Sequence, residues 1–277
     1  MTAGHAPLVA MIAGDIANNT LVIPSMPTSL QKLQVLRSDD KCTVGDVAKI
    51  IQADPALGGK IMAFANSPFI RPPNPISNFE SAIAWMGVPY SISLAYGAAV
   101  ISTFTATEPV LNTLTSQVWR IAGLSSHAAG ILAQTLGKKA FAEEILVALF
   151  SNVGALSLIH HINKTQEYRE RSAQSEMIHV LSEFNGQVTE MVTRAWLLPA
   201  DIVSKIRSVL SDATTEDEMV LLVRSAIGFA LTESSAPFPY PEKCSFRELE
   251  RIVIDESERQ SVIDQVVERI AEEPLIF

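Results

Sequence analysis

The apolar residues of this chain recur at intervals of three and four along almost all of its 277 residues. Recurrence at i, i+3 and i+4 places apolar side chains on one face of a helix. No convincing stretch alternates apolar and polar residues with the period of two that a half-buried strand requires. The sequence therefore predicts an all-α fold.

Composition narrows the class of protein further. Hydrophobic residues make up 48% of the chain, enough to bury a sizeable core, and the net charge is −9. No block of Lys and Arg is present, and a nucleic-acid-binding surface needs such a block. No apolar run reaches the roughly 18 residues of a membrane span, and the N-terminus lacks the basic region of a signal peptide. We expect a cytoplasmic protein that binds neither nucleic acid nor membrane, with Cys42 and Cys244 as isolated thiols.

The stretch from residue 53 to 87 carries an ordered series of helix signals. Pro55 is accepted in the first turn of a helix and disfavours helix at Asp54 before it. The predicted order is a helix, an asparagine stop, a proline-rich link, a helix with a capping box from Ser77 to Glu80, and a glycine stop. Caps and turn hydrogen bonds account for the polar residues of this stretch, and lining of a ligand pocket is the alternative. The residues that define it are Asp54, Pro55, Asn66, Ser67, Pro75, Ile76, Ser77, Glu80 and Gly87.

This order, with its DPAL, ANS and PIS segments, resembles the HDOD family of bacterial helical proteins. The resemblance covers residues 21–210. It implies an N-terminal helical lobe over 1–106 and, over 107–277, a lobe similar to the HD-domain phosphohydrolases. Periodicity predicts helices over 91–105, 110–136, 141–161, 176–196, 202–210 and 216–231, with Gly137 ending the second of these.

The resemblance also indicates where the metal ligands of an HD phosphohydrolase would fall. Such a site holds divalent cations through His and Asp, and the metals generate hydroxide and neutralise phosphate charge. The expected early histidine falls on Ile121, just after Trp119 and Arg120. The other expected ligands, a His-Asp pair, a later histidine and a terminal histidine pair, fall on Ser151-Asn152, Asn185 and Val209-Leu210. Because these side chains are apolar or neutral, we infer that the metal site is absent, with no catalytic residue and no cofactor.

The histidines elsewhere have simpler interpretations. His127 is interpreted as a surface or interhelical hydrogen-bonding residue. His160 and His161 are adjacent, so they point about 100° apart on a helix and are interpreted as helix-end residues. His179 and Glu183 form an exposed i,i+4 pair, and His5 lies in the terminus.

Three functions remain open at this point. The first is a non-catalytic signalling or scaffold protein that works through a protein partner. The second is a nucleotide sensor that uses the former active-site cleft, with contacts from Trp119, Arg120, Ser151, Asn152 and Asn185. The third is a metal-dependent phosphohydrolase with an unrecognised metal set.

Overall fold

The computed structural model describes residues 7–37, 39, 41–67, 70, 72–104, 106–138, 141–171, 173–234 and 240–272. In this part of the chain every regular element is a helix and no strand occurs. The all-α prediction is therefore confirmed. His5 lies outside the described residues.

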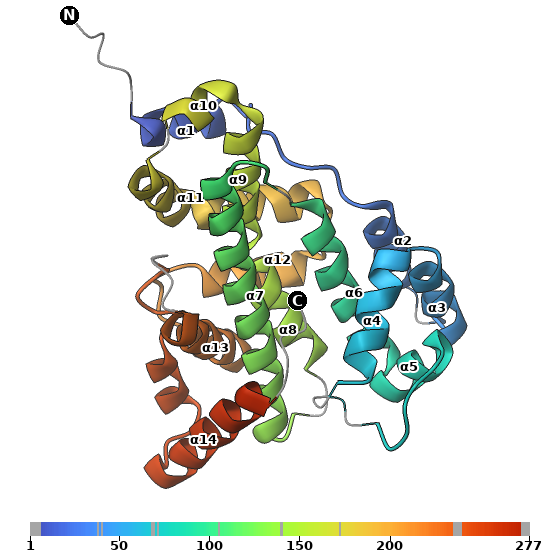
Figure 1. Ribbon diagram of the computed structural model, residues 1–277. Helices are drawn as coiled ribbons and strands as arrows, with labels where there is room; N and C mark the ends of the chain where they lie inside the picture. Colours follow the sequence, from blue (N-terminus) through green and yellow to red (C-terminus); the bar gives the residue numbers. More distant parts are fainter. Residues whose placement is uncertain are drawn as a thin grey trace, which may run out of the picture.

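A first group of helices packs together on one side of the molecule, at the right of Figure 1. It consists of α2 (Thr28–Arg37), α3 (Val44–Gln52), α4 (Pro55–Ala65), α5 (Phe79–Met86) and α6 (Val88–Thr103). Helix α6 is the predicted buried helix, and it packs against α2, α4 and α8. Being covered on several sides explains why its sequence is apolar nearly all round.

A second group is built around the long helix α7 (Pro109–Thr135), which stands upright at the centre of Figure 1. Its closest partners are α8 (Ala142–Phe150), α13 (Glu218–Ser234) and α14 (Glu256–Glu272), while α9 (Val153–Lys164) packs against α11 (Gln174–Ala195). The group also contains α10 (Gln166–Arg171), α12 (Ala200–Val209) and the 3-10 helix η1 (Phe246–Arg251). Gly137 ends α7 in the left-handed conformation, with φ of 76°, as predicted.

The N-terminal helix α1 (Leu8–Ala17) lies beside α10 and α11 of the second group (Figure 1) and packs against α11. Residues 18–27 then lead to α2 in the first group. The lobe boundary between residues 106 and 107 stays a prediction. The position of α1 nevertheless ties the start of the chain to the second group of helices.

The signals of the 53–87 stretch act locally, as the sequence predicts. Asp54 caps α4, and its Oδ1 accepts a hydrogen bond from the backbone N–H of Leu57 at 3.2 Å. Asn66 ends α4, and its side-chain amide pairs with the backbone of Ile76, which donates to Oδ1 at 2.8 Å and accepts from Nδ2 at 2.9 Å. Gly87, with φ of 86°, ends α5, and α6 leaves at 114° to it. Asn66 thus joins the end of α4 to Ile76, which follows the proline-rich link.

Three expectations need correction. The capping box from Ser77 to Glu80 does not form, because α5 begins one residue later with Asn78 as its cap, whose Oδ1 accepts from Ser81 N–H at 2.7 Å. The helix expected over 141–161 breaks after Phe150, where α8 ends and a turn leads into α9. Of the two interpretations of His127, the surface one is wrong, because the residue is buried in α7, which is covered on several sides; the interhelical one stays a prediction.

Among the described residues, Ala142–Lys164 is long and apolar enough to cross a membrane by composition, and Phe79–Met86 with Val88–Val100 reaches that length only as a pair bent by 114°. Within the fold 94% of the apolar window of Ala142–Lys164 is buried, and this stretch is interrupted between α8 and α9. It therefore serves as the core of the second group, where protein and not lipid surrounds it.

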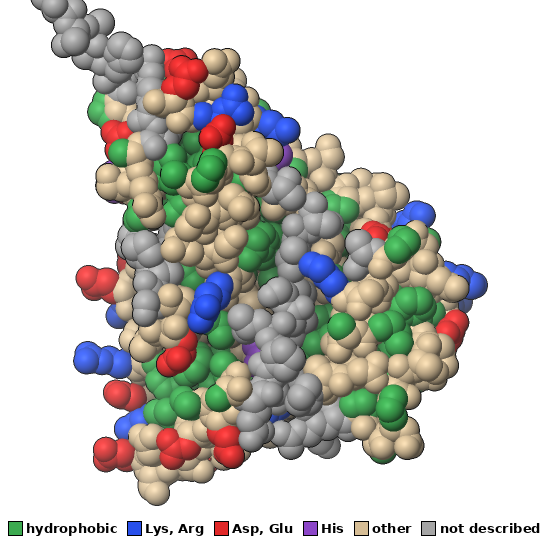
Figure 2. Space-filling view, in the orientation of Figure 1, with side chains coloured by type: hydrophobic (Ala, Val, Ile, Leu, Met, Phe, Trp, Pro, Cys, Tyr) green, Lys and Arg blue, Asp and Glu red, His purple; other side chains and the backbone are tan. Residues whose placement is uncertain are grey.

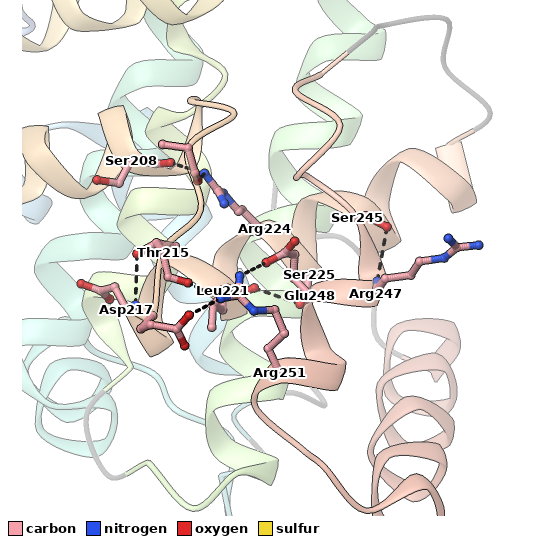
Figure 3. A network of polar contacts seen from close by, with 12 residues as sticks. Ser208, Thr215, Asp217, Leu221, Arg224, Ser225, Ser245, Arg247, Glu248 and Arg251 are labelled. Atoms are coloured by element: carbon pink, nitrogen blue, oxygen red, sulfur yellow. Dashed lines mark hydrogen bonds and ion pairs between the residues drawn. The ribbon is translucent and has the colours of Figure 1, made fainter.

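The C-terminal elements are joined to α12 through a buried arginine, drawn in Figure 3. Arg224 on α13 is fully buried and donates to the carbonyl oxygens of four residues at and just after the end of α12: Ser208, Val209, Ser211 and Ala213. A cation at a helix C-terminus is favourable because the last carbonyls there lack intrahelical partners. Arg224 thereby fixes the turn that follows α12.

Candidate functional site

The turn between α8 and α9 lies where the resemblance places a His-Asp pair. Ser151 and Asn152 are both fully buried. Ser151 Oγ donates to the Val147 carbonyl at 2.8 Å, and Asn152 Nδ2 donates to the Ala148 carbonyl at 3.0 Å. The Val147 carbonyl also accepts the backbone N–H of Ser151 at 3.0 Å, whereas the backbone N–H of Asn152 bonds the Leu149 carbonyl, so the Asn152 side chain supplies the donor for Ala148 at the end of α8.

Asn185 on α11 joins this turn to the neighbouring helix. Its Oδ1 accepts from the backbone N–H of Ala155 at 2.8 Å, and its Nδ2 donates to the Ser151 carbonyl at 3.1 Å. The next turn of α11 adds Thr189, whose Oγ1 accepts from Gly154 N–H at 3.0 Å. A side chain at Gly154 would overlap the backbone of α11, so only glycine permits this approach. The first turn of α9 is therefore bonded to α11 through side chains.

The cluster is closed by a residue from far along the chain. The hydroxyl of Tyr240 donates to Asn152 Oδ1. Burial raises the pKa of Tyr240, so its hydroxyl keeps its proton and remains a donor. Two further contacts hold the segment after Tyr240: the Cys244 thiol faces the Val209 carbonyl at 3.6 Å, and Gly228 lets the backbone of Ser245 approach α13 closely. We call Ser151, Asn152, Asn185, Thr189 and Tyr240 the Asn152 cluster.

The model of the HDOD domain matches residues 23–210, about two thirds of the chain. The chain belongs to the HDOD family. The match begins after α1 and ends at Leu210, so Tyr240 and the C-terminal helices lie outside the matched region.

Solved structures share the fold of this HDOD protein. A candidate metal-dependent phosphohydrolase from Shewanella amazonensis SB2B has a TM-score of 0.71 at 18% identity, covering 94% of this chain and 98% of that one. An HDOD domain protein of unknown function from Geobacter sulfurreducens has a TM-score of 0.70 at 16% identity, covering 95% and 94%. A candidate signal transduction protein from Marinobacter aquaeolei VT8 has a TM-score of 0.63 at 20% identity, and the match covers 92% of this chain but 59% of that protein. No curated protein matches the sequence.

The HDOD protein does not present a donor set that fits an HD-type metal centre. The Asn152 cluster offers neutral amides and hydroxyls, and its side-chain oxygens already accept hydrogen bonds from Tyr240, Ala155 and Gly154. Neutral amides and hydroxyls are weak ligands, and they lack the charge that the carboxylates of an HD-type centre supply. In the part of the chain that the structure describes, no three His, Cys, Asp or Glu side chains gather so that they could hold a metal ion.

The other predicted cleft residues are placed differently from the Asn152 cluster. Trp119 is partly buried against the core, whereas Arg120 is exposed on α7. No hydrogen bond joins either of them to the cluster among the described residues. Ile121 and Val209 are buried apolar residues of the core. Ser151, Asn152 and Asn185 are thus brought together, and Trp119 and Arg120 are not bonded to them.

A hollow of about 600 Å³ lies beside the Asn152 cluster and includes Asn185 and Tyr240 in its lining. Its charged lining consists of four carboxylates and one cation, namely Glu183, Glu190, Asp212, Glu242 and Arg207. Arg207 is bonded to Glu190 through two nitrogens, at 3.0 and 2.7 Å. The hollow therefore has an acidic lining, which opposes the binding of a phosphate-bearing ligand.

The other residues that define the 53–87 stretch do not come together in one site. Pro75, Ile76 and Ser77 line a shallow surface hollow of about 240 Å³ together with the exposed Trp85. Ser67 is buried, and its hydroxyl has no hydrogen-bond partner among the described residues. Glu80 is exposed in the first turn of α5.

A polar clamp that the sequence reasoning missed holds α1 in place. His161 Nδ1 accepts from the backbone N–H of Val22 at 3.0 Å, so Nε2 carries the ring proton and donates to Asp15 Oδ2 at 2.8 Å. Tyr168 donates to the same carboxylate oxygen, and Thr20 donates to Oδ1 at 2.8 Å. Burial raises the pKa of Asp15, but these hydrogen bonds outweigh it and hold that pKa below its usual value. The partners are up to 153 residues apart, so no local pattern could reveal them.

Proposed function

We propose that this HDOD protein is a non-catalytic signalling or regulatory protein of the bacterial cytoplasm that acts by contact with a protein partner. The observation that carries the proposal is the closed Asn152 cluster. Where an HD phosphohydrolase would need charged metal ligands, this chain has neutral side chains that hydrogen-bond one another and the backbone. Family membership and the fold shared with a candidate signal transduction protein support the regulatory part of the proposal.

The nucleotide-sensor alternative is weaker for two reasons. Ser151, Asn152 and Asn185 are buried and their polar groups are already bonded within the protein. The hollow next to them is large enough for a nucleotide, but its charged lining is mostly carboxylate. A nucleotide carries negative phosphates, which carboxylates repel in a partly buried site.

On the face drawn in Figure 2, Lys and Arg side chains are scattered among acidic ones and do not form a block. A nucleic-acid partner needs such a block because it must neutralise several phosphates. A protein partner is the macromolecule that this charge distribution favours.

The test is to identify partners by cross-linking the full-length tagged chain in its native cells and then to measure binding to each purified candidate. The proposal expects at least one partner whose binding is reproduced with both proteins purified. In parallel, thermal unfolding is followed with Mg²⁺, Mn²⁺, mononucleotides and cyclic dinucleotides. A ligand at about 100 times its Kd adds roughly 2.7 kcal/mol to the stability of the folded state. Stabilisation by a nucleotide alone would favour the sensor, and stabilisation that requires metal as well would favour catalysis.

A further inference from the structure

Residues 22–27 form a linker that leads from the region of α1 to α2 in the first group of helices (Figure 1). Among the described residues, two side-chain hydrogen bonds fasten this linker to the second group. His161 Nδ1 accepts from Val22 N–H at 3.0 Å, and Trp196 Nε1 donates to the Pro24 carbonyl at 2.9 Å. The Val22 side chain is 43% exposed and adds little burial. These two bonds therefore fix where the linker backbone lies.

Both bonds lie where the two groups of helices meet. Trp196 follows α11 of the second group, and its ring stacks on that of Phe104, which follows α6 of the first group, with centroids 5.9 Å apart. The ring of His160, next to His161 on α9, meets the same phenyl ring edge-on at 6.3 Å. A change at the linker is therefore adjacent to contacts between the two groups.

Only one protonation state of His161 can hold Val22. A ring nitrogen that accepts a hydrogen bond carries no proton, so the bond from Val22 N–H to Nδ1 requires the neutral ring. A proton from solvent adds to this nitrogen, because Nε2 already carries one. The charged ring donates from both nitrogens, and two N–H groups would then face each other. The bond to Val22 is lost on protonation.

The other nitrogen of His161 responds in the opposite way. Nε2 donates to Asp15 Oδ2 at 2.8 Å, and protonation of the ring turns this contact into an ion pair. The same carboxylate accepts from Tyr168 and from Thr20. Protonation thus frees the linker at Val22, while α1 stays held through Asp15.

The other titratable groups around His161 keep their charge near neutral pH. Burial raises the pKa of Asp15, but hydrogen bonds from Tyr168 and His161 outweigh it and keep that pKa low, so the carboxylate stays ionised. Burial and the bond to Asp15 raise the pKa of Tyr168 to about 12, so its hydroxyl stays a donor. On α9, burial and the charge of Lys164 lower the pKa of His160. In the described part of the chain no charged side chain of α7 or α11 is bonded to His161.

We propose that His161 is a proton-responsive latch for the linker 22–27. The neutral ring holds Val22 and thereby the linker, and the protonated ring releases Val22 and keeps Asp15 as its ion partner. Histidine is the side chain that ordinarily exchanges its proton near neutral pH. The latch gives the protein an input, the proton concentration, which goes beyond the proposed function and does not depend on any partner.

Nuclear magnetic resonance of the full-length, isotope-labelled protein tests the latch. The ring nitrogens report the charge of His161, and hydrogen exchange of the Val22 amide reports its hydrogen bond. From pH 8 to pH 5.5, Val22 exchange, corrected for its intrinsic pH dependence, is expected to rise roughly fivefold or more, because a hydrogen bond is lost. The rise should have the same midpoint as the ring titration. An amide within α1, such as that of Ile12, should keep its protection.

Two variants separate His161 from its neighbour. His161→Gln supplies a carboxamide that can accept from Val22 N–H and donate to Asp15 but cannot bind a proton near neutral pH. Its corrected Val22 exchange is expected to be the same at pH 8 and pH 5.5. His160→Gln is the matched control, because His160 has no hydrogen bond to the linker among the described residues. It is expected to keep the pH response of the wild type.

Two results with the wild type overturn the proposal, whether or not the variants fold. The first is a Val22 amide that stays protected after the His161 ring has taken up its proton. The second is a His161 ring that stays neutral down to pH 5.5. A pH response of Val22 that persists in His161→Gln also overturns it, since another group would then control the linker. None of these results bears on the proposed function, which partner binding tests separately.

Discussion

The hydroxyl of Tyr240 donates a hydrogen bond to the side-chain oxygen of Asn152, 88 residues earlier in the chain. Asn152 stands where the resemblance places the aspartate of an HD pair. Its side-chain oxygen accepts this hydrogen bond from Tyr240, which lies outside the residues matched by the family model. The Asn152 oxygen is therefore already hydrogen-bonded within the protein, and loss of this bond should lower the free energy of unfolding.

Tyr240→Phe removes the donor and leaves Asn152 Oδ1 buried without this partner. A buried polar group left unsatisfied costs about 1–3 kcal/mol, so the free energy of unfolding in urea should fall by that amount. Tyr96→Phe is the matched control, because Tyr96 is buried and its hydroxyl has no hydrogen-bond partner among the described residues. It is expected to be neutral or slightly stabilising. Equal losses in the two variants would contradict the role given to the Tyr240 hydroxyl.

Gly154→Ala should be strongly destabilising. The added methyl group would overlap backbone atoms of Asn185 and Thr189 on α11, which cannot move aside as a flexible side chain could. We expect the loss to be roughly 3 kcal/mol or more by thermal or urea unfolding. Gly59→Ala serves as the control, since a methyl group there meets nothing within 4 Å in helix α4. It should stabilise the protein by about 0.5–1 kcal/mol, because alanine is the better helix former.

Local signals made much of the helical fold predictable. Asp54 and Pro55 mark the start of α4, and Asn66 and Gly137 mark the ends of α4 and α7, because these signals act on backbone groups a few residues away, although Asn66 also bonds Ile76 further along the chain. Where two cap residues are adjacent, as with Ser77 and Asn78, the pattern alone leaves the choice open. In the structure Asn78 is the N-cap of α5.

The candidate site was predictable only in part, because its contacts are not local. Sequence comparison singled out Ser151, Asn152 and Asn185, but it missed Thr189 and Tyr240, and Tyr240 lies beyond the residues that the resemblance covers. Arg224 posed a similar problem: a charged residue within a helix pattern suggests a solvent-facing position, yet it is fully buried against α12. Burial of a charge depends on partners that tertiary packing supplies.

Arg224→Lys tests whether the buried guanidinium holds the end of α12. Lysine keeps the charge but lacks the planar fork that reaches several carbonyl oxygens at once. We expect a loss of roughly 3 kcal/mol in the free energy of unfolding, because carbonyls such as those of Ser208 and Ser211 lose their donor. Arg247→Lys, at an exposed position of η1, should change stability by less than about 0.5 kcal/mol. Comparable effects at the two positions would contradict this account of Arg224.

His127 gives the protein a defined sensitivity to mild acid. Burial in α7, together with the nearby positive charge of Arg269, lowers the pKa of His127 from 6.5 to about 4. The unfolded state therefore binds a proton at a higher pH than the folded state does. By linkage, the free energy of unfolding falls as the pH drops from about 6.5 towards 4 and levels off below that, whereas above pH 7 this contribution is constant.

The lowered pKa of His127 sets the size of this loss. Once the pH is below both pKa values, the free energy of unfolding has fallen by about 3 kcal/mol. Urea unfolding of wild type and His127→Gln at pH 7, 6, 5 and 4 isolates it, because other acid-sensitive groups such as Asp15 contribute equally to both proteins. We expect the stability difference between the two proteins to move in favour of His127→Gln as the pH falls. His179→Gln, at an exposed position of α11, is the control variant for the loss of a histidine. A difference between wild type and His127→Gln that stays constant from pH 7 to pH 4 would mean that His127 accepts its proton equally readily in the folded and unfolded states.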